Sequence, residues 1–233
     1  MHIGEELAQS IQPYEVFSFN LFGLRIPVTD TVINMWIVMA ILIIISVILT
    51  RKMELIPGNK QNLAELFVEF ISDFTKDIIG HNAKYFVPYL GTVFLFLAFA
   101  NALSLLNVVP NFGIRPPTRD INVTFSVALM SVIVVAYAGI RFKKFSGWLR
   151  SYIEPMPLVL PMKIIENVIR MLSLSFRLFG NVLGAFIIME IIYILMPIAL
   201  PAGLSIYFDL FDGILQAFIF IFLTTIYISE AVE

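Results

Sequence analysis

The chain has 233 residues, of which 59% are hydrophobic and 14% are charged, and its mean hydropathy is +0.91. These values exclude an ordinary soluble domain and indicate an integral membrane protein, long enough for a bundle of about five membrane helices. The net charge of −2 argues against a nucleic-acid partner. Because there is no cysteine and only His2 and His81, we expect no disulfide, no bound metal and no cofactor.

The charged residues of segment 1–30 are mostly acidic, and the segment lacks the basic flank and short apolar core of a cleaved signal, so we expect an outer N-terminal segment. A membrane span follows at 31–50. Residues 62–80 alternate apolar and acidic side chains at helical spacing, which predicts an amphipathic surface helix packed on neighbouring subunits or the membrane rim, with recognition of lipid charge as the alternative. Two further spans are expected at 85–109 and 122–140, separated by a Pro-rich loop.

The last two apolar segments, 162–196 and 204–229, are longer than an upright span requires. At 1.5 Å per residue the first would be about 52 Å long, against a hydrocarbon thickness of about 30 Å. We therefore expect both helices to be strongly tilted and paired as a hairpin. The predicted fold is a single, all-α membrane domain with about five membrane helices and one amphipathic surface helix.

Basic residues predict the orientation of the chain in the membrane. Two loop regions are rich in them, whereas the first 30 residues and the Pro-rich loop together hold three. The basic residues of the two rich regions are Arg51, Lys52, Lys60, Lys76 and Lys84, and Arg141, Lys143, Lys144 and Arg150. If both basic loop regions lie on the cytoplasmic side, a chain with five spans has its N-terminus outside and its C-terminus in the cytoplasm.

Arg177 lies in the middle of the apolar segment 162–196. An arginine at mid-membrane costs from roughly 3 to more than 10 kcal/mol, so it is expected to face protein or water and to serve a function. Polar and small residues continue from it along one helical face in steps of three and four. They are Lys163, Glu166, Arg170, Ser173, Asn181 and Gly184. This pattern predicts a polar stripe through the membrane.

Acidic residues are displaced from Arg177 along the two last segments. Glu190 is about 220° round the helix and ~20 Å along it, so it cannot be a simple ion-pair partner of Arg177. On the final helix, helical spacing would place Asp209, Asp212 and Gln216 on one face. A single arginine with displaced carboxylates is the arrangement expected for two aqueous ion pathways separated by a charge barrier.

Three segments resemble a known family, the a subunit of the membrane sector of rotary F-type ATP synthases. Ser173–Asn181, with the sequence SLSFRLFGN, resembles its arginine-centred signature. Leu215–Phe220 with Thr224–Tyr227 resembles its last helix, and Pro117–Thr124 resembles its inter-helix loop. The motifs occur in family order, and the resemblance covers nearly the whole chain.

The resemblance implies a stator subunit that is not catalytic alone and conducts ions through two offset half-channels. Its implied partners are a ring of small c-type subunits, the peripheral-stalk b-type subunits, the remainder of the ATP synthase complex and the lipid bilayer. Arg177 would gate between the half-channels by attracting each ring carboxylate, which favours release of its proton. Asn181 and Gln216 match polar family positions that would hold Arg177 and nearby water.

Family members often carry an acidic residue or histidine nine positions after the arginine, where this chain has Phe186. We therefore assign the outer half-channel to Glu190 and Asp209, with Asp212 as a weaker third member. Glu166 either lines the inner exit or forms a plain salt bridge with Arg170. Asn101 and Ser104 could line a water path, although bonding between helices is the preferred interpretation.

Two other function classes are weighed against the stator. A secondary transporter could also use charged, tilted helices, but no internal repeat or pair of broken helices is found. An intramembrane enzyme would need a nucleophile or metal motif, and none is found. The transported ion is expected to be the proton, with sodium as the alternative, and the chain is expected in the plasma membrane of a bacterium.

Overall fold

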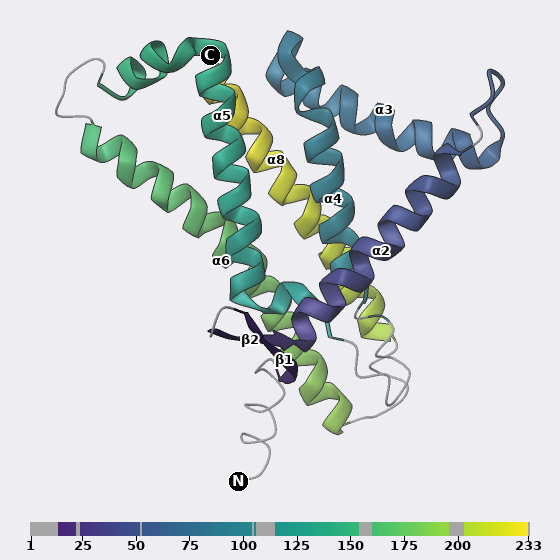
Figure 1. The fold of residues 1–233 in the computed structure, drawn as a ribbon. Coiled ribbons are helices and arrows are strands. Elements are labelled where there is room, and N and C mark those ends of the chain that lie inside the picture. Colours follow the sequence, from purple (N-terminus) through teal and green to yellow (C-terminus); the bar gives the residue numbers. More distant parts are fainter. Residues whose placement is uncertain are drawn as a thin grey trace. The chain divides into compact units, whose positions relative to one another are not determined.

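The computed structural model describes residues 14–21, 24–51, 53–103, 105, 115–153, 160–195 and 203–232, and most of these are helical (Figure 1). The strands are β1 (Glu15–Leu21) and β2 (Leu24–Thr29). The α-helices are α2 (Asp30–Thr50), α3 (Asn59–Ile79), α4 (Val87–Ala102), α5 (Ile121–Ile153), α6 (Leu160–Leu195) and α8 (Gly213–Val232). Two 3-10 helices, η1 (Gly80–Tyr85) and η3 (Pro117–Arg119), and a π-helix, η5 (Ile206–Asp212), complete the described elements.

Four helical segments of the described chain are long and apolar enough to cross a membrane, and a bent pair makes up to five. The four are Asp30–Thr50, Ile121–Arg150, Leu160–Ile192 and Gly203–Val232. In the bent pair, Asn59–Tyr85 meets Val87–Ala102 at 116°. Apolar side chains on α2, such as Ile43, Ile44 and Ile48, are exposed, as expected of a helix that faces lipid. The chain is thus a helical, multi-pass membrane protein, and its described residues include one β-hairpin besides the helices.

Helix α3 is the amphipathic helix expected at 62–80, and it begins three residues earlier. Its acidic side chains are exposed, while Phe74 packs against Phe218 and Phe222 of α8 at ring-centroid distances of 5.3 and 6.1 Å. Gly80 ends the helix with a φ of 75°, a left-handed conformation that favours glycine. The chain can therefore turn sharply into α4 (Figure 1).

The remaining helices differ from the expected segments mainly in length. Helix α4 ends at Ala102 in the described chain, whereas the expected span 85–109 continues into residues outside the described part. Helix α5 continues past the expected end at residue 140, and only Lys144 (φ 61°, ψ 159°) interrupts it. The indole of Trp148 lies against Gly139, where a Cβ would come within 2.5 Å of it. The charged stretch after residue 140, which suggests a loop in the sequence, is therefore largely helical.

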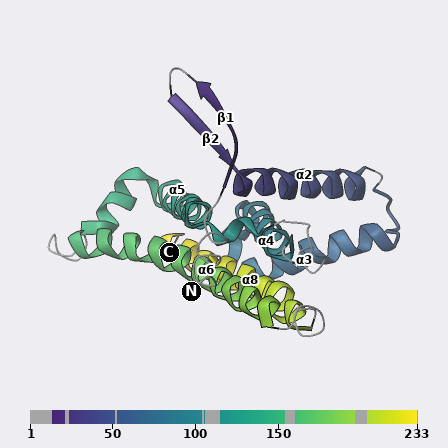
Figure 2. The ribbon, with the colours of Figure 1, turned by 90° about the horizontal axis from the view of Figure 1, so that it is seen from below.

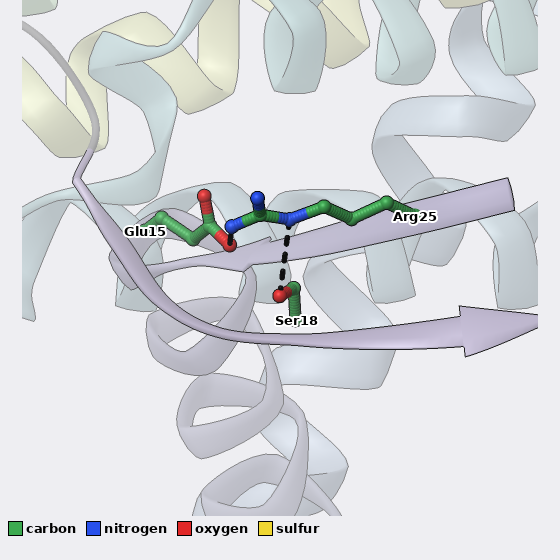
Figure 3. Close-up of polar contacts among 3 residues, drawn as sticks. All are labelled: Glu15, Ser18 and Arg25. Carbon is green, nitrogen blue, oxygen red and sulfur yellow. Dashed lines mark hydrogen bonds and ion pairs between the residues drawn. The ribbon is translucent and has the colours of Figure 1, made fainter.

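Strands β1 and β2 form an antiparallel hairpin that leads into α2 and was not expected from the sequence (Figures 1 and 2). The Arg25 guanidinium donates hydrogen bonds to the Glu15 carboxylate (2.7 Å) and the Ser18 hydroxyl (3.2 Å) across the hairpin (Figure 3). The bond from Arg25, assisted by Ser18, holds the pKa of the Glu15 carboxyl below its usual value. The Asp30 amide donates to the Tyr14 carbonyl (3.1 Å), which ties the base of the hairpin to the first turn of α2.

Contacts divide the chain into two compact units. The first unit comprises Met1–Ile48, Leu95–Val123 and Leu178–Ala217, and the second comprises Leu49–Phe94, Thr124–Arg177 and Phe218–Glu233. In the first unit, Val38, Ala100 and Leu103 form a buried apolar cluster. In the second unit, polar bonds join the helices, including Tyr89 to Ser131 (2.8 Å) and the Ser229 hydroxyl to the Ile78 carbonyl (2.9 Å). Side-chain hydroxyl groups that bond across helices are typical of helix contacts within membranes.

Candidate functional site

Arg177 lies in the middle of the 36-residue helix α6 and its side chain is exposed. Its neighbours Leu174 and Leu178 are buried, at 2% and 0% exposure. Within the described part of the chain, the guanidinium has no ion-pair or hydrogen-bond partner. An arginine stays charged, and a charge that lacks a partner within a membrane is costly.

One helical turn beyond Arg177, Asn181 reaches the last helix. Its Nδ2 donates a hydrogen bond of 2.7 Å to Oε1 of Gln216 on α8. Gln216 is almost completely buried, at 1% exposure. The structure therefore brings together the two amide residues that the sequence assigned to one site, and their bond links α6 to α8 within the first unit.

Replacing Asn181 with leucine is expected to destabilise the protein by about 1–3 kcal/mol, because it leaves the buried Gln216 amide without this donor. The measurement is the thermal denaturation of the purified protein in lipid. The double variant Asn181→Leu/Gln216→Leu should lose less stability than the sum of the two single variants, since it removes both polar partners. Strictly additive losses would show that the bond contributes nothing to joining the helices.

The three acidic residues assigned to the outer pathway all belong to the first unit. Glu190 lies thirteen residues after Arg177 on α6 and is partly buried. Asp209 and Asp212 are partly buried within the π-helix η5. A π-helix bonds residues i and i+5 and is wider than an α-helix, so the spacing argument that put these two carboxylates on one face with Gln216 does not hold there. Single-turn π segments are frequent at functional sites.

A cluster that the sequence analysis did not identify surrounds Arg119. Its guanidinium pairs with Asp30 at 3.1 Å, and the two side chains are only 2% and 4% exposed. The same guanidinium lies over the ring of Phe186, 5.0 Å from its centroid. Burial, reinforced by the charge of Arg115, lowers the Arg119 pKa, and Asp30 opposes this shift. An arginine nevertheless remains protonated, so the position nine residues after Arg177 has a buried cation beside it.

Hydrogen bonds extend this cluster to the last helix. The Thr118 hydroxyl donates to Oδ1 of Asn101 (2.5 Å), and Nδ2 of Asn101 donates to the carbonyl of Gly213 at the start of α8 (3.1 Å). Thr118 and Asn101 are buried, at 0% and 3% exposure. The preferred interpretation of Asn101, bonding between helices, is confirmed, whereas Ser104 lies outside the described residues.

At the other end of α6, in the second unit, Arg170 bridges two helices. It donates to Glu166 on its own helix and pairs with Glu230 of α8 at 2.6 Å, while its guanidinium lies over the Tyr227 ring at 4.6 Å. The salt bridge considered for Glu166 is thus present, and Glu230 is a further partner. Glu166 also lines a cavity of about 210 Å³ together with Lys143. The salt bridge and a position on a cavity wall are therefore compatible.

Comparison with known proteins identifies the family. The sequence profile of the ATP synthase A chain matches residues 32–229. The chain is 34% identical over 223 residues to ATP synthase subunit a of Moorella thermoacetica, covering 96% of this chain and 98% of that protein. It is 35% identical over 217 residues to ATP synthase subunit a, sodium ion specific, of Propionigenium modestum, covering 88% and 75%. The chain therefore belongs to the ATP synthase A chain family and is a non-catalytic, ion-translocating subunit of the membrane sector of an F-type ATP synthase.

Proposed function

We propose that this chain is the stator of an ion-driven rotary motor, with two offset half-channels and Arg177 as the electrostatic gate between them. The observation that carries the proposal is the exposed Arg177 guanidinium in the middle of α6, which has no counter-charge within the described chain. A rotating ring of small c-type subunits, each with a membrane carboxyl group, would supply that counter-charge. Peripheral-stalk b-type subunits and the rest of the complex would hold the stator still.

The gate works through the charge of Arg177. A cation close to a carboxyl group favours its ionised form, so each ring carboxyl that reaches Arg177 releases its ion. Because the guanidinium does not lose its own proton, it cannot pass protons on and blocks direct leakage between the half-channels. Asn181 and Gln216 hold the neighbouring turn of α6 against α8, which is supported by their 2.7 Å hydrogen bond.

The remaining polar residues are divided between the two pathways. Glu190, Asp209 and Asp212 line the outer half-channel, and their partial burial in the first unit supports this assignment. Glu166 lines the inner exit, supported by its place on the wall of the cavity in the second unit. Arg170 pairs with Glu166 and keeps that carboxylate in position.

The transported ion is a proton. Sodium is the alternative, because the Propionigenium modestum relative is named as sodium ion specific. Ion selectivity depends largely on the ring carboxyl and its surroundings, which belong to another chain. The chain lies in the plasma membrane of a bacterium. Its N-terminus is outside and its C-terminus is in the cytoplasm, because the basic loops are retained inside.

Disulfide cross-linking to the ring tests this proposal, and the absence of native cysteine leaves this chain without background. Gly180 and Gly184 follow Arg177 on its face of α6, and a Cβ at either position meets no atom within 4 Å. Cysteine at these positions should form a disulfide with a cysteine next to the ring carboxyl. The control, Leu178→Cys, should not react, because Leu178 is fully buried. Equal cross-linking from all three positions would contradict a ring that faces Arg177, and a chain that purifies without a ring would support the transporter alternative.

A further inference from the structure

Asp30 has one partnered and one unpartnered carboxylate oxygen. Oδ2 accepts a hydrogen bond from Arg119 (3.1 Å), while Oδ1 is buried and has no hydrogen-bond partner among the described residues. The side chain is only 4% exposed, and Asp30 is the first residue of α2. Buried carboxylate oxygens are almost always hydrogen-bonded, so an oxygen in this state indicates a position for an external donor.

Polar groups, all of them buried except Asn181, lead from this carboxylate through the first unit. Asp30 pairs with Arg119, next to Thr118, which is bonded through Asn101 to the Gly213 carbonyl. Three residues after Gly213, Gln216 is bonded to Asn181 on α6. We call these six residues, from Asp30 to Asn181, the polar trail: Asp30, Arg119, Thr118, Asn101, Gln216 and Asn181.

The polar trail reaches the segments that hold the acids of the outer half-channel. Gly213 directly follows Asp212, and Arg119 lies over Phe186, one turn before Glu190. Polar groups within a membrane protein commonly mark ion pathways, and water in such places makes about three hydrogen bonds to groups that lack another partner. A carboxylate that keeps one oxygen free at the end of the trail is therefore suited to bind water or the water shell of a small cation.

We propose that Asp30 is a cation-pathway residue of the outer half-channel, and that its Oδ1 accepts hydrogen bonds from the water shell of the entering monovalent cation. Arg119 is a positioning residue, which turns the other carboxylate oxygen away from the pathway. This inference rests on the proposed function and adds residues from α2 and η3 to it. The alternative is a buried ion pair that only joins segments 89 positions apart in the sequence.

Variants in the complete complex, reconstituted in vesicles, separate these two roles. Removing one partner of a buried ion pair is strongly destabilising, whereas removing both is often nearly neutral. We therefore compare Asp30→Asn and Arg119→Met with the double variant Asp30→Asn/Arg119→Met, and measure the amount of assembled complex and the ATP synthesis rate per complex. The matched control is Glu15→Gln/Arg25→Met, which removes an exposed ion pair of the same unit and should change neither quantity.

The single variants should assemble poorly, and the double variant should assemble well. The synthesis rate per complex of the double variant should be roughly tenfold below the wild-type rate, which is the effect of about one lost charged hydrogen bond. A double variant with the wild-type rate would overturn the proposal, because the pair would then be only structural. If the double variant fails to assemble, Asp30→Glu decides. If Asp30→Glu has a higher synthesis rate per complex than Asp30→Asn, the pathway needs the carboxylate. Equal rates in the two variants contradict the proposal.

Two further comparisons identify the cation and keep this inference separate from the proposed function. Rates in sodium-free buffer and with added sodium show whether hydronium or sodium reaches Asp30. Since Arg177 is intact in the Asp30 variants, none of them should leak ions. Coupled synthesis in an Arg177→Ala complex would reject the gate itself, whatever the Asp30 variants show, whereas a normal rate in the double variant rejects the role of Asp30 alone.

Discussion

Replacing Arg177 with alanine is expected to abolish ion-driven ATP synthesis and to open a passive ion leak through the membrane sector. Without the guanidinium, a ring carboxyl loses the cation that favours its ionised form, and ions can pass between the half-channels without turning the ring. Synthesis is measured in vesicles that contain the complete complex. The leak is measured in the same vesicles after removal of the catalytic sector.

The matched control for this experiment is Phe176→Ala, which changes the adjacent side chain on the same helix. Phe176 is 54% exposed and carries no charge, so this variant should retain coupled synthesis and remain tight to ions. Both variants should contain the ring in wild-type amounts, which excludes failed assembly as the cause. Coupled synthesis in Arg177→Ala would contradict the gate and favour a scaffold or transporter in which the charge is merely accommodated.

The class of the protein, a multi-pass helical membrane protein, could be predicted from the sequence because lipid imposes strong constraints. A single apolar segment satisfies its own backbone hydrogen bonds within a bilayer only as a helix, and α2 and α6 begin and end close to the expected residues. Arg177 is conspicuous for the same reason, since a charge in an apolar helix has few structural explanations. Helical spacing also suggested that Glu166 and Arg170 are neighbours, and they are paired.

The cluster around Arg119 could not be predicted, because its contacts join distant parts of the sequence. Asp30 and Arg119 are 89 positions apart, and nothing local in the sequence indicates that one neutralises the other. The π-helix could not be predicted because spacing arguments assume the 3.6 residues per turn of an α-helix. Asp209 and Asp212 are three positions apart, which suits an α-helix, but both lie in the π-helix. The hairpin could not be predicted with helical spacing, because its strands have a period of two and are short, although Val16, Phe17 and Phe19 are residues that favour strands.

Replacing Gly213 with alanine is expected to impair assembly severely, because α4 and α8 approach each other at this residue. A Cβ at position 213 would lie 2.7 Å from the Cβ of Asn101, an atom that cannot move without its backbone. Overpacking of this kind costs about 1–3 kcal/mol. It would also strain the bond from the Asn101 amide to the Gly213 carbonyl. The measurements are the thermal denaturation of the purified complex and the amount of this chain recovered in it.

Gly203→Ala is the matched control, because a Cβ at position 203 meets nothing within 4 Å. Alanine there should keep or raise stability by up to about 1 kcal/mol, since glycine loses more conformational freedom on folding. A loss confined to Gly213→Ala therefore reports the helix contact rather than any general need for glycine. If Gly213→Ala were as stable as the control, α4 and α8 could not be as close as the Asn101 contact requires. The polar trail would then lose its connection between these helices, and the proposed role of Asp30 would lose its structural support.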